Sequence, residues 1–317
     1  MSACSVGSLA IDEPLPGTAP AAQCWVIIEQ PGPWGSRALL DSTLDTILGQ
    51  QLIERAEGTG TSLLLARHPD RTDRTLTEHN VWVVHTSPGD SWMRHGILRD
   101  LTEIATWDFA AMAQGQLPPV GIKLVDPTMF ICTHSGRDAC CAVHGRALLS
   151  AVHSALPPED RASVWECSHL GGHRFAPTAL TIPSGAVWGR LTLERALEIH
   201  GSAFAREITT DSYRGRSAWP QPLQSAEAHV RQVTGERSEN ALDVLWVTDD
   251  RAIPVRPGVR FENLAQLMAE VRHQDGRSWR VMVRTQEVED RAESCGKDPV
   301  SGIAWVPIAM TESARWR

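Results

Sequence analysis

Sulfur and imidazole side chains are concentrated in one short stretch of this chain. Four of the seven cysteines and five of the twelve histidines lie in or beside residues 132–173: Cys132, Cys140, Cys141, Cys167, His134, His144, His153, His169 and His173. Such residues are ligands of zinc and iron–sulfur centres. An odd number of cysteines in 317 residues is not typical of a disulfide framework. We therefore expect a metal or cluster centre here, and we treat Cys4, Cys24 and Cys295 as incidental because they carry no spacing signal.

The spacing within this stretch narrows the kind of centre. Cys132 and Cys141 are separated by eight residues, and His169 and His173 by three. Two thiolates and two imidazoles complete either a structural zinc site or a [2Fe–2S] cluster with two cysteines on one iron and two histidines on the other. The histidine pair does not fit a helical metalloprotease, because that motif needs a glutamate after the first histidine.

Neighbouring residues offer alternative ligands. Cys132-Thr-His134 and Cys141-Ala-Val-His144 match the two short ligand units of a Rieske protein. However, only six residues separate these units, fewer than we expect between the two loops of that fold. The residues alone leave four replacements of the proposed ligands open: His134, His144, Cys140 and Cys167.

The order of predicted elements indicates an α/β fold with more than one unit. At ~100–200 residues per domain, the length suggests two domains. A Gln-Leu-Pro-Pro turn at 116–119 and Asp126-Pro127 mark a boundary near residue 120. The elements after this boundary follow a βαβ-then-β order, which is typical of a small α/β layer fold: a strand at 129–132, a helix at about 143–156, and strands at 163–168 and 175–182.

The flanking regions show both the two-residue period of strands and the 3.6-residue period of helices, and no internal repeat is visible. The first 120 residues predict these elements: strands at 25–29, 61–66 and 81–85, and helices at about 42–56 and 97–107. The last 100 residues predict one helix and three strands: a helix at 225–233 and strands near 242–248, 278–286 and 303–308. A helix at 192–200, with Thr192 as its cap, lies between them, and the charge-rich stretch 287–298 is predicted to be a solvated loop.

Charge and hydropathy exclude several classes of partner. Thirty basic against thirty-eight acidic residues give a net charge of −8, which disfavours nucleic acid as the main partner. No apolar run approaches the ~18–20 residues of a membrane helix. Residues 1–17 contain no lysine or arginine and do not form a secretory signal. We therefore expect a cytoplasmic protein that binds neither membrane nor nucleic acid.

Two segments together resemble the sucrase/ferredoxin-like family: Cys132-Thr-His-Ser-Gly-Arg-Asp-Ala-Cys-Cys141 and Cys167-Ser-His-Leu-Gly-Gly-His-Arg-Phe-Ala176. The resemblance covers about residues 20–205. It implies a thioredoxin-like ferredoxin domain with a bis-histidinyl [2Fe–2S] cluster, in which Cys132 and Cys141 hold one iron and His169 and His173 the other. The expected fold class is thus α/β, with an N-terminal α/β domain at 1–120, the ferredoxin domain at 121–205 and a C-terminal α/β segment at 206–317.

The resemblance implies a soluble electron-transfer protein. A ligating imidazole has a second ring nitrogen that can lose a proton, so reduction can be coupled to protonation at that nitrogen. Neutral imidazoles in place of thiolates raise the potential of such a cluster. The chain has no G-x-G-x-x-G motif after a strand, so the electrons would come from a separate reductase and pass to an unknown acceptor. Two alternatives remain: a zinc-stabilised binding module that uses the same four ligands, and a thiol oxidoreductase, although the chain lacks a C-x-x-C motif. We find no carboxylate pair that favours a hydrolase.

Overall fold

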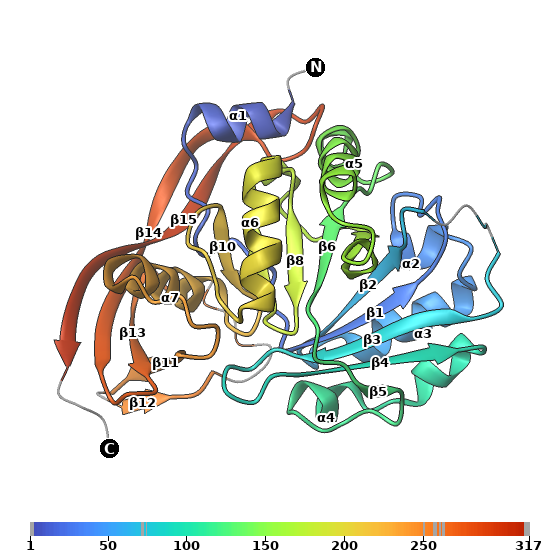
Figure 1. Ribbon diagram of the computed structural model, residues 1–317. Coiled ribbons are helices and arrows are strands. Elements are labelled where there is room, and N and C mark those ends of the chain that lie inside the picture. Colours follow the sequence, from blue (N-terminus) through green and yellow to red (C-terminus); the bar gives the residue numbers. More distant parts are fainter. Residues whose placement is uncertain are drawn as a thin grey trace.

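The computed structural model describes residues 3–70, 73, 75–249, 251–255, 259, 261 and 264–313 (Figure 1). The protein is a mixed α/β structure with one ten-stranded and one five-stranded sheet. The α/β class predicted from the sequence is therefore confirmed. None of the helices in the described ranges combines the length and the apolar character needed to cross a bilayer.

The ten-stranded sheet contains residues from 24 to 216 in the order β10-β9-β8-β6-β7-β2-β1-β3-β4-β5. Its strands have these bounds: β1 Cys24–Glu29, β2 Thr61–Arg67, β3 His79–His85, β4 Trp92–Leu98, β5 Ile122–Lys123, β6 Thr128–Cys132, β7 Val164–Cys167, β8 Ala179–Ile182, β9 Ala186–Trp188 and β10 Tyr213–Arg216. The helices have these bounds: α1 Cys4–Ala10, α2 Ala38–Asp41, α3 Thr46–Ala56, α4 Phe109–Ala113, α5 Arg146–Ala155, α6 Leu193–Phe204 and α7 Gln221–Thr234. Four helical turns of 3₁₀ or π type among the described residues have these bounds: η1 Leu101–Thr106, η2 Cys141–Gly145, η3 Arg161–Ser163 and η4 His173–Phe175.

The two halves of this sheet repeat one topology. In the first half β1 runs parallel to β2, with α3 in the crossover, and antiparallel to β3, which pairs with β4. In the second half β6 has the same relationships to β7, across α5, and to β8, which pairs with β9. The second half follows the βαβ-then-β order predicted after residue 120, and the first half shares this topology without any visible sequence repeat.

The halves join where the carboxyl ends of their parallel strands meet. The last two residues of β2, Ala66 and Arg67, pair antiparallel with Cys167 and Glu166, the last two of β7. The boundary predicted near residue 120 falls between β4 and β5 of this continuous sheet, and it stays a prediction. One core is shared by both halves, where the rings of Trp82 and Trp165 lie 4.7 Å apart. The carboxyl ends of β1, β2, β6 and β7 therefore meet in the middle of the sheet. Such a meeting point is the usual place for a ligand in an α/β sheet.

Side-chain caps begin several of the helices. The side chain of Asp45 accepts a hydrogen bond from the Leu48 amide and begins α3, and Thr192 caps α6 as the sequence predicts. The helix predicted at 97–107 is only partly correct. Ile97 and Leu98 complete β4, because Asp100 caps the shorter turn η1 that follows.

The five-stranded sheet is formed by the C-terminal residues and is covered by α7 (Figure 1). Its strands have these bounds: β11 Leu242–Thr248, β12 Arg251–Ile253, β13 Gln266–His273, β14 Ser278–Ala292 and β15 Pro299–Ser313. The long β14–β15 hairpin reaches the N-terminal helix α1 (Figure 1). The stretch 287–298 is therefore not a solvated loop as predicted, since its first part extends β14 and its tip packs against the rest of the protein.

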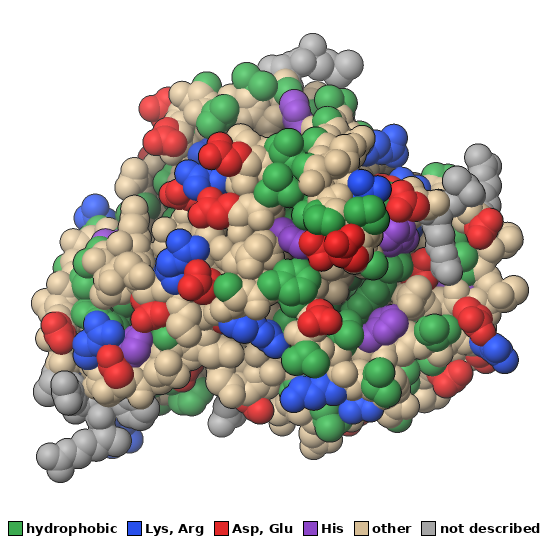
Figure 2. Space-filling model, in the orientation of Figure 1, with side chains coloured by type: hydrophobic (Ala, Val, Ile, Leu, Met, Phe, Trp, Pro, Cys, Tyr) green, Lys and Arg blue, Asp and Glu red, His purple; other side chains and the backbone are tan. Residues whose placement is uncertain are grey.

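One face of the protein is mixed in charge (Figure 2). On the face shown in Figure 2, acidic and basic side chains are interspersed, and hydrophobic side chains lie among them.

Candidate metal centre

Cys132 is the last residue of β6, and Cys141 begins the turn η2 that leads into α5. Both side chains are buried in the core shared by the two halves. The close approach of η2 to β6 depends on Gly145, because a Cβ atom there would overlap the carbonyl oxygen of Cys132. Gly136 has a similar role in the loop between the cysteines, where a Cβ atom would overlap the Gly35 carbonyl.

The two histidines lie in the loop that follows β7. The Ser168 amide donates to the carbonyl of Leu65 and its hydroxyl accepts from the Leu65 amide, so the loop is anchored to β2. Gly171 and Gly172 have φ values of 73° and 67°, which only glycine adopts without strain. They turn the chain sharply between His169 and His173.

Three of the predicted ligands converge. Donor atoms of Cys132, Cys141 and His169 all lie within 4.8 Å of one another, so this group can hold a metal ion. His173 stands beside this set, with its Nδ1 atom 3.4 Å from His169 Nε2. The Nδ1 atom of His169 is buried and has no hydrogen-bond partner among the described residues. Two thiols and an imidazole are ligands that zinc and iron–sulfur centres use, so the residues present fit such a group.

The outer nitrogen of His173 is held by two residues from other segments. Its Nε2 atom lies 2.8 Å from Ser294 Oγ, in the tip of the β14–β15 hairpin, and 3.6 Å from Asp138 Oδ2. Burial lowers the pKa of His173, and the Asp138 carboxylate opposes that shift. Metal-ligating histidines commonly have a carboxylate or hydroxyl on the nitrogen away from the metal. The C-terminal segment thus takes part in the site, which the sequence did not indicate.

The two sulfur atoms are electrostatically unequal. A hydrogen bond from Cys141 lowers the pKa of Cys132 well below its ordinary value. His169 also lowers this pKa, whereas burial raises it. The same hydrogen bond and burial raise the pKa of Cys141. Cys132 therefore favours the thiolate form, whereas the thiol of Cys141 keeps its proton until a metal cation displaces it.

A buried arginine, Arg214 in β10, faces the histidine loop. Its guanidinium donates to the Gly171 carbonyl at 3.1 Å and also contacts the backbone of Thr18. Burial lowers its pKa to about 9, and the two cysteines oppose that shift. A cation near two thiolates stabilises their negative charge. Arg214 has no sequence signal, since it is one arginine among many in a different part of the chain.

The alternative ligands lie outside this donor group. The Nε2 atom of His134 is 2.8 Å from the carbonyl oxygen of Gly35, and His144 lies in η2 without joining the group. Cys167 is buried and pairs with Cys132 across β6 and β7, but it is not among the converging donors. The ligand set proposed from the sequence remains a prediction, with three members clustered and the fourth adjacent.

A second donor group lies on the far side of His173, and here the expectation of incidental cysteines is wrong. Cys4 and Cys295 meet Cys140 and Asp138, although residues 4 and 295 are far apart in the sequence. No spacing rule could reveal this group, because its members come from three separate segments. Cys24 is buried in β1, outside both groups, and remains incidental.

Comparison with known proteins gives one match. No curated protein and no solved structure matches the chain. The sequence model of one family, described as sucrase/ferredoxin-like, matches residues 15–215. That region contains Cys132, Cys141, His169 and His173 and the whole ten-stranded sheet apart from the last residue of β10. This chain belongs to the sucrase/ferredoxin-like family.

Proposed function

We propose that this protein is a one-electron carrier that holds a [2Fe–2S] cluster on Cys132, Cys141, His169 and His173. The observation that carries the proposal is the convergence of Cys132, Cys141 and His169, with His173 beside them. The cysteines lie together at the end of β6 and the start of η2, and the histidines lie together in the next loop. Each pair suits one iron of a two-iron cluster.

The same arrangement argues against a single zinc ion on these four residues. A tetrahedral ion needs all four donor atoms at similar distances from one point. His173 stands outside the set of three atoms that converge within 4.8 Å. A cluster with two metals accommodates donors that are spread in this way.

A [2Fe–2S] cluster supplies reversible one-electron transfer. The chain sets the conditions for it. Two neutral imidazoles in place of thiolates remove two negative charges and favour the reduced state, and the buried Arg214 guanidinium acts in the same direction. The cysteine sulfurs are almost fully buried, which suits a cofactor ligand better than a thiol that must reach a substrate.

The proposal requires a separate electron donor and an acceptor. His169 and His173 are the more exposed ligands, so electrons are expected to enter and leave on the histidine side. A cleft of about 270 Å³ is lined by Thr133 and His134, which directly follow Cys132, and by Arg67 and Arg146 among others. The proposal assigns no substrate to this cleft.

The test is spectroscopy with metal analysis on anaerobically purified full-length protein. We expect two irons and two acid-labile sulfides per chain, visible absorption that bleaches with dithionite, and an EPR signal of the reduced state with a low average g value. Cys132→Ser or Cys141→Ser should abolish these signals. Cys24→Ser is the matched control, since Cys24 is equally buried but lies outside both donor groups.

Two results would overturn the proposal. One is a colourless protein with zinc bound through Cys132 and Cys141, which would make these residues a structural clamp. The other is full iron and sulfide in the Cys132→Ser variant, which would remove Cys132 from the ligand set.

A further inference from the structure

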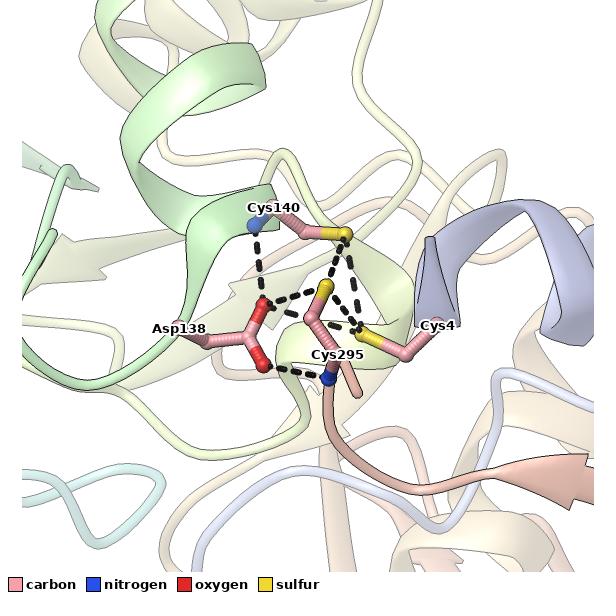
Figure 3. Close-up of side chains that lie close together, drawn as sticks. All are labelled: Cys4, Asp138, Cys140 and Cys295. Carbon is pink, nitrogen blue, oxygen red and sulfur yellow. Dashed lines mark hydrogen bonds between the residues drawn. The ribbon is translucent and has the colours of Figure 1, made fainter. Parts of the chain in front are cut away.

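A compact group of three thiols and one carboxylate lies beside His173 (Figure 3). The Sγ atoms of Cys4, Cys140 and Cys295 form a triangle with sides of 3.6, 3.2 and 3.7 Å. The Oδ1 atom of Asp138 lies 3.7 Å from Cys4 Sγ and 3.2 Å from Cys295 Sγ. Figure 3 shows all four side chains pointing toward one another. We propose that Cys4, Asp138, Cys140 and Cys295 bind one structural zinc ion.

The distances fit a single tetrahedral ion. With zinc–sulfur bonds of about 2.3 Å and zinc–oxygen bonds of about 2.0–2.2 Å, neighbouring sulfurs in a tetrahedral site lie about 3.8 Å apart, and sulfur and oxygen about 3.5 Å apart. The observed edges of 3.2 to 3.7 Å need only a small expansion to reach these values. Thiolates on different irons of a cluster would stand farther apart, because the irons and sulfides lie between them.

The surrounding hydrogen bonds orient the ligands. The Cys140 amide donates to Asp138 Oδ1 at 2.8 Å, and the Cys295 amide donates to Asp138 Oδ2 at 2.9 Å. The hydroxyl of Ser5 donates to Cys140 Sγ at 3.2 Å. Outer contacts of this kind hold metal ligands in position and are part of a built metal site.

The chemistry of the donors selects zinc. Three thiolates are soft ligands that exclude magnesium and calcium, and a carboxylate is an accepted fourth ligand for zinc. Four protein donors leave no open position, which is the mark of a structural rather than a catalytic site. Cys4, Cys140 and Asp138 are buried, and Cys295 is partly exposed at the hairpin tip, so that an ion can enter from that side.

A disulfide between Cys140 and Cys295 explains less of this arrangement. Their sulfurs lie 3.2 Å apart, whereas a disulfide bond is about 2.0 Å long. Such a bond would also leave Cys4 and the Asp138 carboxylate without a reason to converge on the same point.

The ion would join three segments that lie far apart in the sequence. Cys4 begins α1, Asp138 and Cys140 lie between β6 and η2, and Cys295 lies in the tip of the β14–β15 hairpin. The same hairpin tip supplies Ser294 to His173. Zinc at this position would therefore fasten the hairpin and α1 over the histidine side of the first centre.

The test uses the full-length chain in a Cys132→Ser/Cys141→Ser background, so that the proposed cluster ligands cannot bind the metal that is measured. We expect one zinc per chain in this double variant, and a cobalt-substituted form with sulfur-to-cobalt charge-transfer bands. Adding Cys295→Ser should remove most of the zinc, whereas adding Cys24→Ser should leave it unchanged. Cys295 lies outside the strands, and circular dichroism checks that the variant folds.

Three results would overturn the zinc site. In the first, the double variant binds neither zinc nor cobalt after reduction. In the second, adding Cys295→Ser leaves the zinc content unchanged. In the third, freshly purified protein contains a Cys140–Cys295 disulfide and no zinc. If Cys295→Ser fails to fold, cobalt titration of the chelator-stripped double variant decides, since the absence of thiolate charge-transfer bands rejects the site. None of these results bears on the iron and sulfide content of the wild type, so the two proposals fail separately.

Discussion

The Nε2 atom of His173 lies 3.6 Å from the Oδ2 atom of Asp138. The other oxygen of this carboxylate lies 3.2 Å from Cys295 Sγ, so one side chain contacts both donor groups. Although burial favours its neutral form, backbone N–H donors from Cys295 and Cys140 lower the pKa of Asp138. Because both oxygens are held in this way, the two groups are expected to respond together to a change at Asp138.

Asp138→Asn should weaken the zinc site and change the first centre in the same protein. We expect zinc affinity to fall by more than about 10-fold, since losing an outer partner of a ligand already costs about 10–100-fold and Asp138 is itself a proposed ligand. We also expect the potential of the cluster to rise, because a negative charge beside His173 is removed. Competition with a zinc chelator and a redox titration measure the two effects. Asp298→Asn removes an exposed charge near the same hairpin tip and should change neither, so an equal effect there would refute the shared role of Asp138.

His169→Cys or His173→Cys should keep a cluster but lower its potential. A thiolate adds negative charge and stabilises the oxidised state, and potentials of thiolate and Rieske-type clusters differ by ~250 mV or more. We therefore expect a decrease on the order of 100 mV for one replacement, measured by EPR-monitored redox titration. His144→Gln is the control and should leave the potential unchanged. If the histidine variants have the wild-type potential, the imidazole ligands must be sought elsewhere, with His134 and His144 as the first candidates.

Gly145→Ala should destabilise the protein although its backbone conformation suits alanine. A Cβ atom at this position would overlap the carbonyl oxygen of Cys132. Such overpacking costs about 1–3 kcal/mol, and it should also displace Cys132 and reduce iron content. Gly201→Ala is the matched control, because Gly201 is an exposed residue of α6 with open space around its Cβ position. That control should raise the free energy of unfolding in urea by about 0.5–1 kcal/mol. Equal effects of the two substitutions would contradict the predicted contact between η2 and β6.

Glu13→Gln should destabilise the protein at neutral pH and much less in acid. The buried Glu13 carboxylate lies 2.8 Å from Arg174 Nε and 2.9 Å from an Arg291 amino group. Although burial opposes ionisation, the hydrogen bond from Arg291 and the charge of Arg174 lower the pKa of Glu13. The ionised Glu13 therefore contributes its full stabilisation above the pKa of a glutamate in the unfolded chain, about 4.3. This stabilisation is lost as the pH falls through the lower pKa of Glu13 in the folded protein.

We expect a loss of about 3 kcal/mol at pH 7 for Glu13→Gln, because two buried or partly buried guanidinium groups lose their partner. Denaturant unfolding at a series of pH values measures the difference from the wild type. The control is Glu159→Gln, which changes an exposed glutamate. A loss that does not depend on pH would show that the charge of Glu13 is not its source.

Much of this molecule follows from local sequence patterns. Strands at 25–29, 61–66 and 242–248 were predicted within one residue at each end, since short β-branched and apolar runs bounded by turn residues have few other solutions. Ligand spacing and the paired glycines 171 and 172 likewise indicate a metal or cluster loop, because the required donors and the required backbone freedom are both visible in the sequence. The chain alone thus determined the α/β class, most of the elements and the first donor group.

Tertiary structure decided which distant residues meet. The repeated topology of the two halves has no sequence signal, because many sequences fill the same strand order. Cys4 and Cys295 have no meaningful spacing from Cys140, and Ser294 and Arg214 have none from the histidines. These contacts arise because the β14–β15 hairpin and β10 return to the middle of the chain, and such a return depends on packing across the whole molecule. A sequence pattern records only neighbours along the chain, so it could reveal the first centre but not the residues that surround it.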